Sequence, residues 1–413
     1  MKKKEIEDIN DFIQWLYLKV NFITITCSDT DMAIRIFNVL NARGLALSAT
    51  DIFKGELLKK LAKEEDQEEF VSRWNALRQK CLDNESKFPK RKENKREKNA
   101  AEILFSWYLT YLHPVTSGKN MEERLADQFE RLNKPPLEYL KGIENFYNAY
   151  CEVLEMQDRY AHLLSYLASD FWRVILCTSI LHHYSPQDIE ALKELLVKFY
   201  YQNWVAEQKE PKKQTNCNII NALKEKKNID DIISVVKQYL DKNKITQNFR
   251  EKLKDDHLYE EHKKASKNSW LRPILILVEY FMSDDDRPKC IQMDKNLQVE
   301  HILPQNPTLS SQWAKDFSEE ERERYTHSLA NLTLLGGKRN TEASNLDFKD
   351  KKKIYMGEEN RLSNRLSKKK TFGVMTCYKM TIDIAHHYTE WTPKSLEKRE
   401  KELIEIIESV LTL

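Results

Sequence analysis

Glycine and proline are scarce in this chain, with eight glycines and eleven prolines among 413 residues. Both residue types are poor helix formers, so their scarcity removes the commonest causes of helix breaks. Charged residues make up 32% of the sequence, which also fits a chain of solvated helices. We therefore expect a mainly α, multi-helical chain that is long enough for two or three domains, each with its own core.

Cysteine is sparse and never clustered. The seven cysteines stand singly, without any Cys-x-x-Cys pair, which argues against a zinc knuckle. An odd, unclustered set suits a reducing compartment, so we expect a cytoplasmic protein. The seven are Cys27, Cys81, Cys151, Cys177, Cys217, Cys290 and Cys377.

Long hydrophobic runs are missing as well. No apolar stretch reaches ~18 residues without a charge, so we expect no membrane span and no membrane partner. The N-terminus reads Met-Lys-Lys-Lys-Glu-Ile-Glu-Asp, and no apolar core follows its basic residues, which argues against a secretory signal. A glycine-rich phosphate loop of the Walker type is also absent.

What the sequence does have is a group of polar motifs near the C-terminus. Residues 299–305 read Val-Glu-His-Ile-Leu-Pro-Gln, residues 331–340 read Asn-Leu-Thr-Leu-Leu-Gly-Gly-Lys-Arg-Asn, and Ser-Asn follows at 344–345. Hydrolysis of a phosphodiester needs an imidazole to take a proton from water, and a divalent ion held by oxygen ligands. Glu300, His301 and Asn340 supply such groups.

The same residues also have a purely structural interpretation. A histidine after a β-like run can be a hydrogen-bonded core residue. Asparagine often occupies turns, because it tolerates left-handed backbone and caps backbone groups. The ordered set of motifs, rather than His301 alone, favours the nuclease interpretation.

As a set in this order, the motifs resemble those of the HNH, or ββα-metal, nucleases. They are most similar to the C-terminal nuclease domain of GmrSD-like type IV restriction enzymes, which are modification-dependent. The resemblance covers roughly the last 120 residues and implies a small α+β, ββα-metal module near the C-terminus. Besides the motifs above, it rests on Phe348, Lys351 and Tyr355, and on Trp391 and Arg399 in an expected closing helix.

The resemblance implies roles for individual residues. His301 is expected to be the general base that activates water, and Asn340 a metal ligand with a catalytic role at the start of the α element. Asn331, the middle residue of the trio, is expected to hold the motif's loop and to orient the imidazole. Glu300 stands where many of these nucleases have a metal-binding aspartate. Oxygen ligands without cysteine favour Mg²⁺ or Mn²⁺ as the cofactor.

Basic residues gather in two segments. Residues 86–98 contain seven Lys or Arg against two acids, and residues 338–370 contain eleven against five. Clustered positive charge attracts a phosphate backbone. We interpret the first segment as a solvated loop, whereas the second follows the presumed metal site and should contact double-stranded DNA, modified or plain. The expected DNA-binding residues are Asn345, Lys349, Lys351, Lys352 and Lys353.

A second resemblance lies near the N-terminus. Residues 37–44 read Phe-Asn-Val-Leu-Asn-Ala-Arg-Gly, with Leu47 and Asp51 behind them. They look like the closing part of the ParB-like domain that precedes the nuclease in the same enzymes. The Asp-Gly-Gln-Gln-Arg motif that this family links to nucleotide hydrolysis is missing. We therefore expect a truncated ParB-like domain at 1–64, and no nucleotide cofactor for this chain alone. A helical middle domain should follow at 65–288, and the nuclease with its closing helix at 289–413.

Three functional interpretations follow from these motifs. The favoured one is a metal-dependent DNA endonuclease that acts in prokaryotic defence against phage with modified DNA. The second is a DNA-binding, regulatory or nuclease subunit that is inactive without a separately encoded N-terminal partner. The third is the relic of a truncated gene.

Local sequence signals predict several elements to be compared with the structure. Ser185, followed by Pro186 and Asp188, is a strong helix start, and Ser318 with Glu321 forms a capping box. The expected helices are 5–18, 100–112, 163–181, 189–205 and the buried 270–282, and the expected strand is 22–26.

Overall fold

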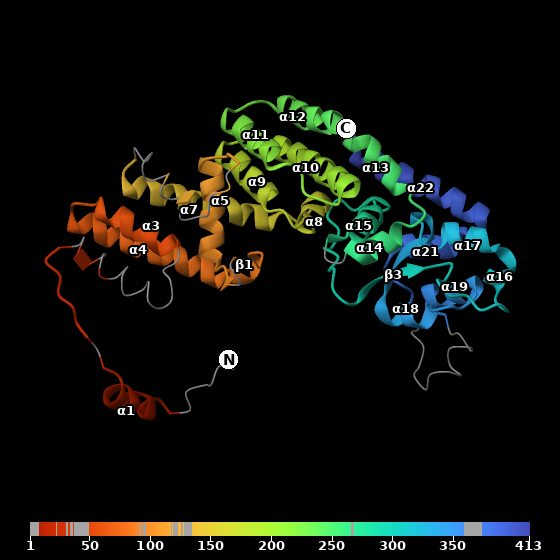
Figure 1. The fold of residues 1–413 in the computed structure, drawn as a ribbon, viewed down its shortest axis with the longest axis horizontal. Helices are drawn as coiled ribbons and strands as arrows, with labels where there is room; N and C mark the ends of the chain where they lie inside the picture. The colour runs from red at the N-terminus through yellow and green to blue at the C-terminus, as the bar shows by residue number, and fades with distance from the viewer. Residues whose placement is uncertain are drawn as a thin grey trace. The chain divides into compact units, whose positions relative to one another are not determined.

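A computed structural model gives the fold, which Figure 1 traces from helix α1 to helix α22. It describes residues 8–413 except 22, 30–31, 34–35, 37–48, 91, 94–95, 117, 119–122, 125–126, 128–133, 266–267 and 359–373, with only the backbone of 49, 92–93 and 96–97. The described residues are mainly helical, as the scarcity of glycine and proline predicts. None of the described helices is long and apolar enough to cross a bilayer.

The chain divides into two compact units, which are described separately. One consists of Met1–Glu102 and Asn120–Lys141, and the other of Ile103–Lys119 and Gly142–Leu413. This division differs from the three expected segments, 1–64, 65–288 and 289–413, whose boundaries stay a prediction.

The first unit contains three helices and a small hairpin among its described residues. Helix α1 begins after Asp8, whose carboxylate accepts a hydrogen bond from Asn10 N at 2.7 Å. The strand expected at 22–26 is wrong, because Ile23–Thr26 has no regular secondary structure. The ParB-like string at 37–44 lies outside the described residues. The elements are α1 (Ile9–Lys19), α3 (Ala49–Lys59), α4 (Glu64–Asp83), the 3-10 turn η1 (Glu85–Lys87), β1 (Lys92–Glu93) and β2 (Arg96–Glu97).

The second unit begins with a set of helices, of which α5 and α7 start in the first unit. They are α5 (Ala100–Leu112), α7 (Pro136–Glu155), α8 (Arg159–Ser165), α9 (Phe171–Leu181), α10 (Pro186–Glu207), α11 (Lys213–Lys224), α12 (Ile229–Lys242), α13 (Ile245–Leu253), α14 (Leu258–Ala265) and α15 (Leu271–Phe281). The expected helices 100–112 and 270–282 are confirmed, and so is the helix start at Ser185, where the structure shows a capping box with Asp188 before α10.

The helix expected at 163–181 is divided into α8 and α9. Between them Phe171 N donates to the Ser169 hydroxyl, and the Arg173 side chain pairs with Asp170 at 3.1 Å. Short polar side chains compete with the backbone for hydrogen bonds in this way, and they favour a helix start over a helix interior.

The C-terminal part of this unit contains a second pair of strands, of which Figure 1 labels the first, β3. Its elements are β3 (Leu297–His301), α16 (Gln312–Asp316), α17 (Glu319–Tyr325), the 3-10 turn η3 (Leu329–Asn331), β4 (Leu332–Gly336), α18 (Gly337–Ala343), α19 (Phe348–Met356), α21 (Lys379–His387) and α22 (Pro393–Leu411). The predicted capping box of Ser318 and Glu321 begins α17.

The buried helix α15 anchors this region. The carboxylate of Glu279 accepts hydrogen bonds from Lys379 N at 2.6 Å and Met380 N at 2.9 Å, at the start of α21. In turn, Thr381 of α21 donates its hydroxyl to Leu334 O in β4. Helix α21 is therefore hydrogen-bonded both to α15 and to strand β4, and these bonds fix the strand pair β3–β4 against α15.

Candidate active site

Strands β3 and β4 form an antiparallel pair, and helix α18 follows β4 without a loop. His301 lies opposite Leu332 and Glu300 opposite Thr333 in the register. Gly337 N, at the start of α18, donates to Asn296 O just before β3 at 2.8 Å. This strand–strand–helix order brings the residues of the first motif and the residues of the second into one small structure.

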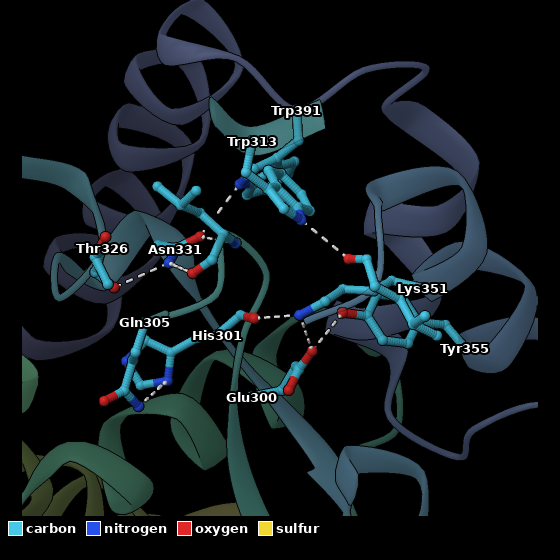
Figure 2. A network of polar contacts seen from close by, with 11 residues as sticks. Glu300, His301, Gln305, Trp313, Thr326, Asn331, Lys351, Tyr355 and Trp391 are labelled. Atoms are coloured by element: carbon cyan, nitrogen blue, oxygen red, sulfur yellow. Dashed lines mark hydrogen bonds and ion pairs between the residues drawn. The ribbon is translucent and has the colours of Figure 1, made fainter. Parts of the chain in front are cut away.

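Glu300 and His301 are both buried, with exposed fractions of 4% and 7%. Because successive side chains of a strand point to opposite faces of the sheet, the two neighbours enter different surroundings. Figure 2 shows this separation: the Glu300 carboxylate lies with Lys351 and Tyr355, and the His301 ring lies beside Gln305.

On the first face, Glu300 forms a buried ion pair with Lys351 of α19. The ammonium of Lys351 donates to Glu300 Oε1 at 2.7 Å and to His301 O at 2.6 Å, and the Tyr355 hydroxyl donates to the same Oε1 at 3.1 Å. Burial raises the pKa of Glu300 and lowers the pKa of Lys351, and in each case the opposite charge of the partner resists the shift.

These contacts change two expectations. Lys351 is 0% exposed, so the expectation that it contacts DNA is wrong: its charge is bound inside the domain. The expected metal-ligand role of Glu300 is disfavoured as well, because Oε1 already accepts two hydrogen bonds and the side chain is buried. Through His301 O, Lys351 instead fixes the backbone of the histidine.

On the second face, His301 lies in an aromatic pocket. The Tyr259 ring packs edge-on against it with ring centroids 4.2 Å apart, and the His327 ring lies 5.5 Å away at 87°. Burial, assisted by the positive charges of His327 and Lys351, lowers the pKa of His301 to about 3. The imidazole is therefore neutral at pH 7, which is the form that can accept a proton.

The two ring nitrogens of His301 differ in their partners. Nδ1 lies 3.3 Å from the Gln305 side-chain amide, whereas Nε2 has no hydrogen-bond partner among the described residues. The amide nitrogen of Gln305 is the atom that faces Nδ1, and a half-turn of the amide group places its oxygen there instead. Nδ1 then carries the proton and Nε2 keeps its lone pair, so Gln305 can select the tautomer that a general base needs.

Asn331 holds the loop that follows His301, and Figure 2 shows it together with Thr326 and Trp391. Its amide nitrogen donates to Leu303 O at 2.8 Å and Thr326 O at 2.9 Å, while Oδ1 accepts from Leu303 N at 2.7 Å and Trp391 Nε1 at 3.2 Å. Asn331 is 0% exposed, so every polar atom of the side chain is used inside the domain. It fits the expected loop-holding role, but as a positioning residue it cannot touch a substrate.

Two C-terminal residues named by the resemblance, Trp391 and Arg399, help to hold Asn331 and the turn that precedes β4. Trp391 lies just ahead of helix α22, rather than within it, and donates to Asn331 as described above. Arg399, in α22, donates to Ala330 O and is 4% exposed. The closing helix therefore holds the turn that carries Asn331.

Asn340 lies in α18 and keeps an unused oxygen. Its side-chain Oδ1 is buried and has no hydrogen-bond partner in the described part of the chain. A buried carbonyl oxygen without a partner is costly, and a hard divalent cation is one partner that would complete it. No hydrogen bond joins the Asn340 side chain to Glu300 or His301. No group of three or more His, Cys, Asp or Glu among the described residues is arranged to hold a metal.

The other expected DNA-binding residues have different surroundings. Lys349 is exposed. Lys352 donates to Tyr388 O at 2.7 Å, and Lys353 pairs with Asp350 at 2.9 Å, so each of these two ammonium groups already has an acceptor. Asn345 is exposed, and its amide donates to Asn306 O at 2.9 Å. The lysines of α19 therefore do not form one free basic face.

Sequence reasoning missed three residues around His301. Gln305 belongs to the first motif, four residues after the histidine, and its place there could have suggested a contact. His327 lies just after helix α17; its ring is stacked with that of Tyr259, with ring centroids 5.8 Å apart, and burial lowers its pKa. Tyr259 lies 42 positions before His301, and no local pattern points to its role.

A comparison with protein families matches residues 244–406 to a family described as GmrSD restriction endonucleases, C-terminal domain. The matched range includes the residues of the site, from Tyr259 to Arg399. This part of the chain is thus similar to a restriction endonuclease domain and supports a GmrSD-like relationship. None of the curated proteins matches the chain.

Proposed function

We propose that the chain is a metal-dependent DNA endonuclease of the HNH type that hydrolyses phosphodiester bonds in defence against phage. The observation that carries the proposal is the state of His301. Its ring is neutral at pH 7, is held by Tyr259 and Gln305, and leaves Nε2 without a protein partner among the described residues. A restriction endonuclease family match over the same residues supports DNA as the substrate.

The reaction assigns one proton transfer to the histidine. His301 Nε2 accepts a proton from a water molecule, whose oxygen forms a bond to phosphorus as the bond between phosphorus and one bridging oxygen breaks. A Mg²⁺ or Mn²⁺ ion would stabilise the developing negative charge on the phosphate. The Asn340 oxygen is the donor available to hold such an ion, since it is buried without a partner in the described residues.

Positioning groups act on the histidine from both sides. Lys351 binds the carbonyl of His301, and Asn331 binds both backbone groups of Leu303, two residues further on. Since small misplacements of a catalytic group lower the rate strongly, these bonds serve the reaction without touching the substrate.

The test is cleavage of plain and phage-derived modified DNA by the purified chain, with Mg²⁺, with Mn²⁺ and with EDTA. We expect metal-dependent cleavage that falls about 10²–10⁴-fold in His301→Ala. His386→Ala is the matched control, because His386 is an exposed histidine of α21. Equal rates for the parent and His301→Ala would refute the assignment. DNA binding without cleavage would favour a binding subunit that depends on a partner.

A further inference from the structure

A cleft of about 560 Å³ lies beside the candidate site, between helix α14, the beginning of α15 and strand β3. This volume is within the range of small-molecule sites, about 300–1,000 Å³, and is ample for one nucleotide. Tyr259 and His262 of α14, Arg272 of α15 and Val299 of β3 contribute to its walls.

The charge of the cleft is positive. Lys263 and Arg272 line it, and neither side chain forms an ion pair with any described residue. The described residues of the lining include no carboxylate. The nearby acids of α14 are directed to other partners: Glu261 pairs with Lys252 at 3.0 Å, and Glu260 lies 3.5 Å from His327. Two free cations in a concave site without an acid attract an anion such as a phosphate.

The cleft also offers a neutral polar group. His262 is 5% exposed, its Nδ1 bonds to the Ser269 hydroxyl, and its Nε2 has no hydrogen-bond partner among the described residues. Burial lowers the pKa of His262 to about 4, so this ring is neutral at pH 7. Met293 and Val299 add apolar surface, so the lining combines cations, polar groups and apolar contacts.

The cleft is joined to the candidate site through two residues. Tyr259 lines the cleft and packs against the His301 ring at 4.2 Å between centroids. Val299 lines the cleft and precedes His301 by two residues on β3, which is about 7 Å along a strand. A group in the cleft therefore lies within the reach of one nucleotide from a phosphate at His301.

We propose that this cleft binds a single nucleotide of the DNA strand, next to the phosphate that is cleaved. Arg272 and Lys263 bind the nucleotide's own phosphate, and His262 with Ser269 forms the polar wall for its sugar or base. This subsite rests on the proposed nuclease function, because it assigns a neighbouring position on the same substrate.

The first experiment measures binding without cleavage. The full chain in EDTA is titrated calorimetrically with deoxythymidine monophosphate, with thymidine and with inorganic phosphate. We expect the monophosphate to bind more tightly than either fragment, and Arg272→Gln to weaken it about tenfold. Lys263→Gln should weaken it less, since Lys263 is exposed. Lys401→Gln, an exposed lysine of α22, is the matched control and should not change binding.

Three results would overturn the subsite: no binding of the monophosphate, equal binding of inorganic phosphate, or unchanged binding in Arg272→Gln with normal folding. The second experiment separates this outcome from a failure of the proposed function. In cleavage assays, Arg272→Gln should raise KM about tenfold with kcat nearly unchanged. Cleavage by the parent with an unchanged KM in Arg272→Gln overturns the subsite alone, whereas absence of any cleavage counts against the nuclease.

Discussion

The two faces of strand β3 differ in how completely their buried polar side chains are hydrogen-bonded. On one face, the Glu300 carboxylate accepts hydrogen bonds from Lys351 and Tyr355, and this network is closed within the domain. On the other face, the His301 ring has an unpartnered nitrogen, within the described part of the chain, and a cleft beside it.

This difference separates the face of β3 that stabilises the fold from the face that can bind a substrate. Leaving a buried polar atom without a hydrogen bond costs about 1–3 kcal/mol, so such atoms are rare unless something outside the protein completes them. His301 Nε2, Asn340 Oδ1 and His262 Nε2 are three such atoms in this region. The satisfied face holds the strand in place, and the unsatisfied face is where a substrate can gain contacts.

The largest effect, on the free energy of unfolding, is expected from breaking the buried ion pair of Glu300 and Lys351. Lys351→Met removes the partner of Glu300 and leaves a carboxylate buried without its counter-charge, so the free energy of unfolding should fall by about 3–5 kcal/mol. Urea unfolding followed by circular dichroism measures it. Lys349→Met, on the exposed side of the same helix, is the control and should change little.

The double variant Glu300→Gln/Lys351→Met sharpens this prediction. A neutral amide is less costly to bury than an unpaired charge, so the double variant should regain part of the loss. If Lys351→Met is no less stable than Lys349→Met, the buried ion pair does not support the strand.

The stability of the protein should depend on pH through the two buried histidines, His301 and His262. The pKa of His301 is lowered to about 3 and that of His262 to about 4, whereas an unfolded histidine titrates near 6.5. The unfolded state therefore binds protons more tightly, and the free energy of unfolding falls as the pH drops below about 6.5. Each histidine contributes a slope of up to about 1.4 kcal/mol per pH unit.

Urea unfolding in EDTA between pH 7 and pH 5 measures this slope. His301→Gln and His262→Gln should each flatten it, because each removes one group that must be protonated on unfolding. His386→Gln, at an exposed position, should leave it unchanged. Equal slopes in all four proteins would show that the rings are not held neutral.

The parts of the fold that follow local rules were predictable. Helix α10 begins after the capping box of Ser185, and α17 after that of Ser318, because a cap is defined by residues three positions apart. The strand expected at 22–26 failed because a strand needs a partner, and β-branched residues alone do not provide one.

The site could be predicted in part. The motif gave Glu300 and His301, but it could not say that the two enter different environments with different partners. The sequence does carry a signal for the burial of Lys351, because Phe348, Lys351 and Tyr355 follow the i, i+3, i+7 spacing of a core-facing stripe. The contact between Tyr259 and His301 joins residues 42 positions apart in the sequence, and no local pattern specifies it.

A smaller effect is expected from removing the unpartnered side-chain oxygen of Asn340. Asn340→Ala removes one neutral ligand candidate, so the Mg²⁺ concentration for half-maximal cleavage should rise about tenfold, with partial rescue at high Mn²⁺. Titration of the cleavage rate with each metal measures this. Thr341→Ala, an exposed neighbour in α18, is the control. An unchanged metal requirement in Asn340→Ala would remove this residue from the site.

The smallest effect is expected on DNA binding by the lysines of α19. It should distinguish the exposed lysine from those that already bind an acceptor within the protein. Lys349 is exposed, whereas Lys352 donates to Tyr388 O and Lys353 pairs with Asp350. Each phosphate contact releases counterions, so Lys349→Gln should reduce the slope of log affinity against log salt by about one unit, equally for all DNA sequences. Lys352→Gln is the matched comparison and should leave the slope unchanged. Fluorescence anisotropy with a labelled duplex in EDTA, at several salt concentrations, measures both. A normal slope in folded Lys349→Gln would mean that this lysine only solvates the helix, and that the DNA backbone is bound by other cations, of which Arg272 and Lys263 are the first to examine.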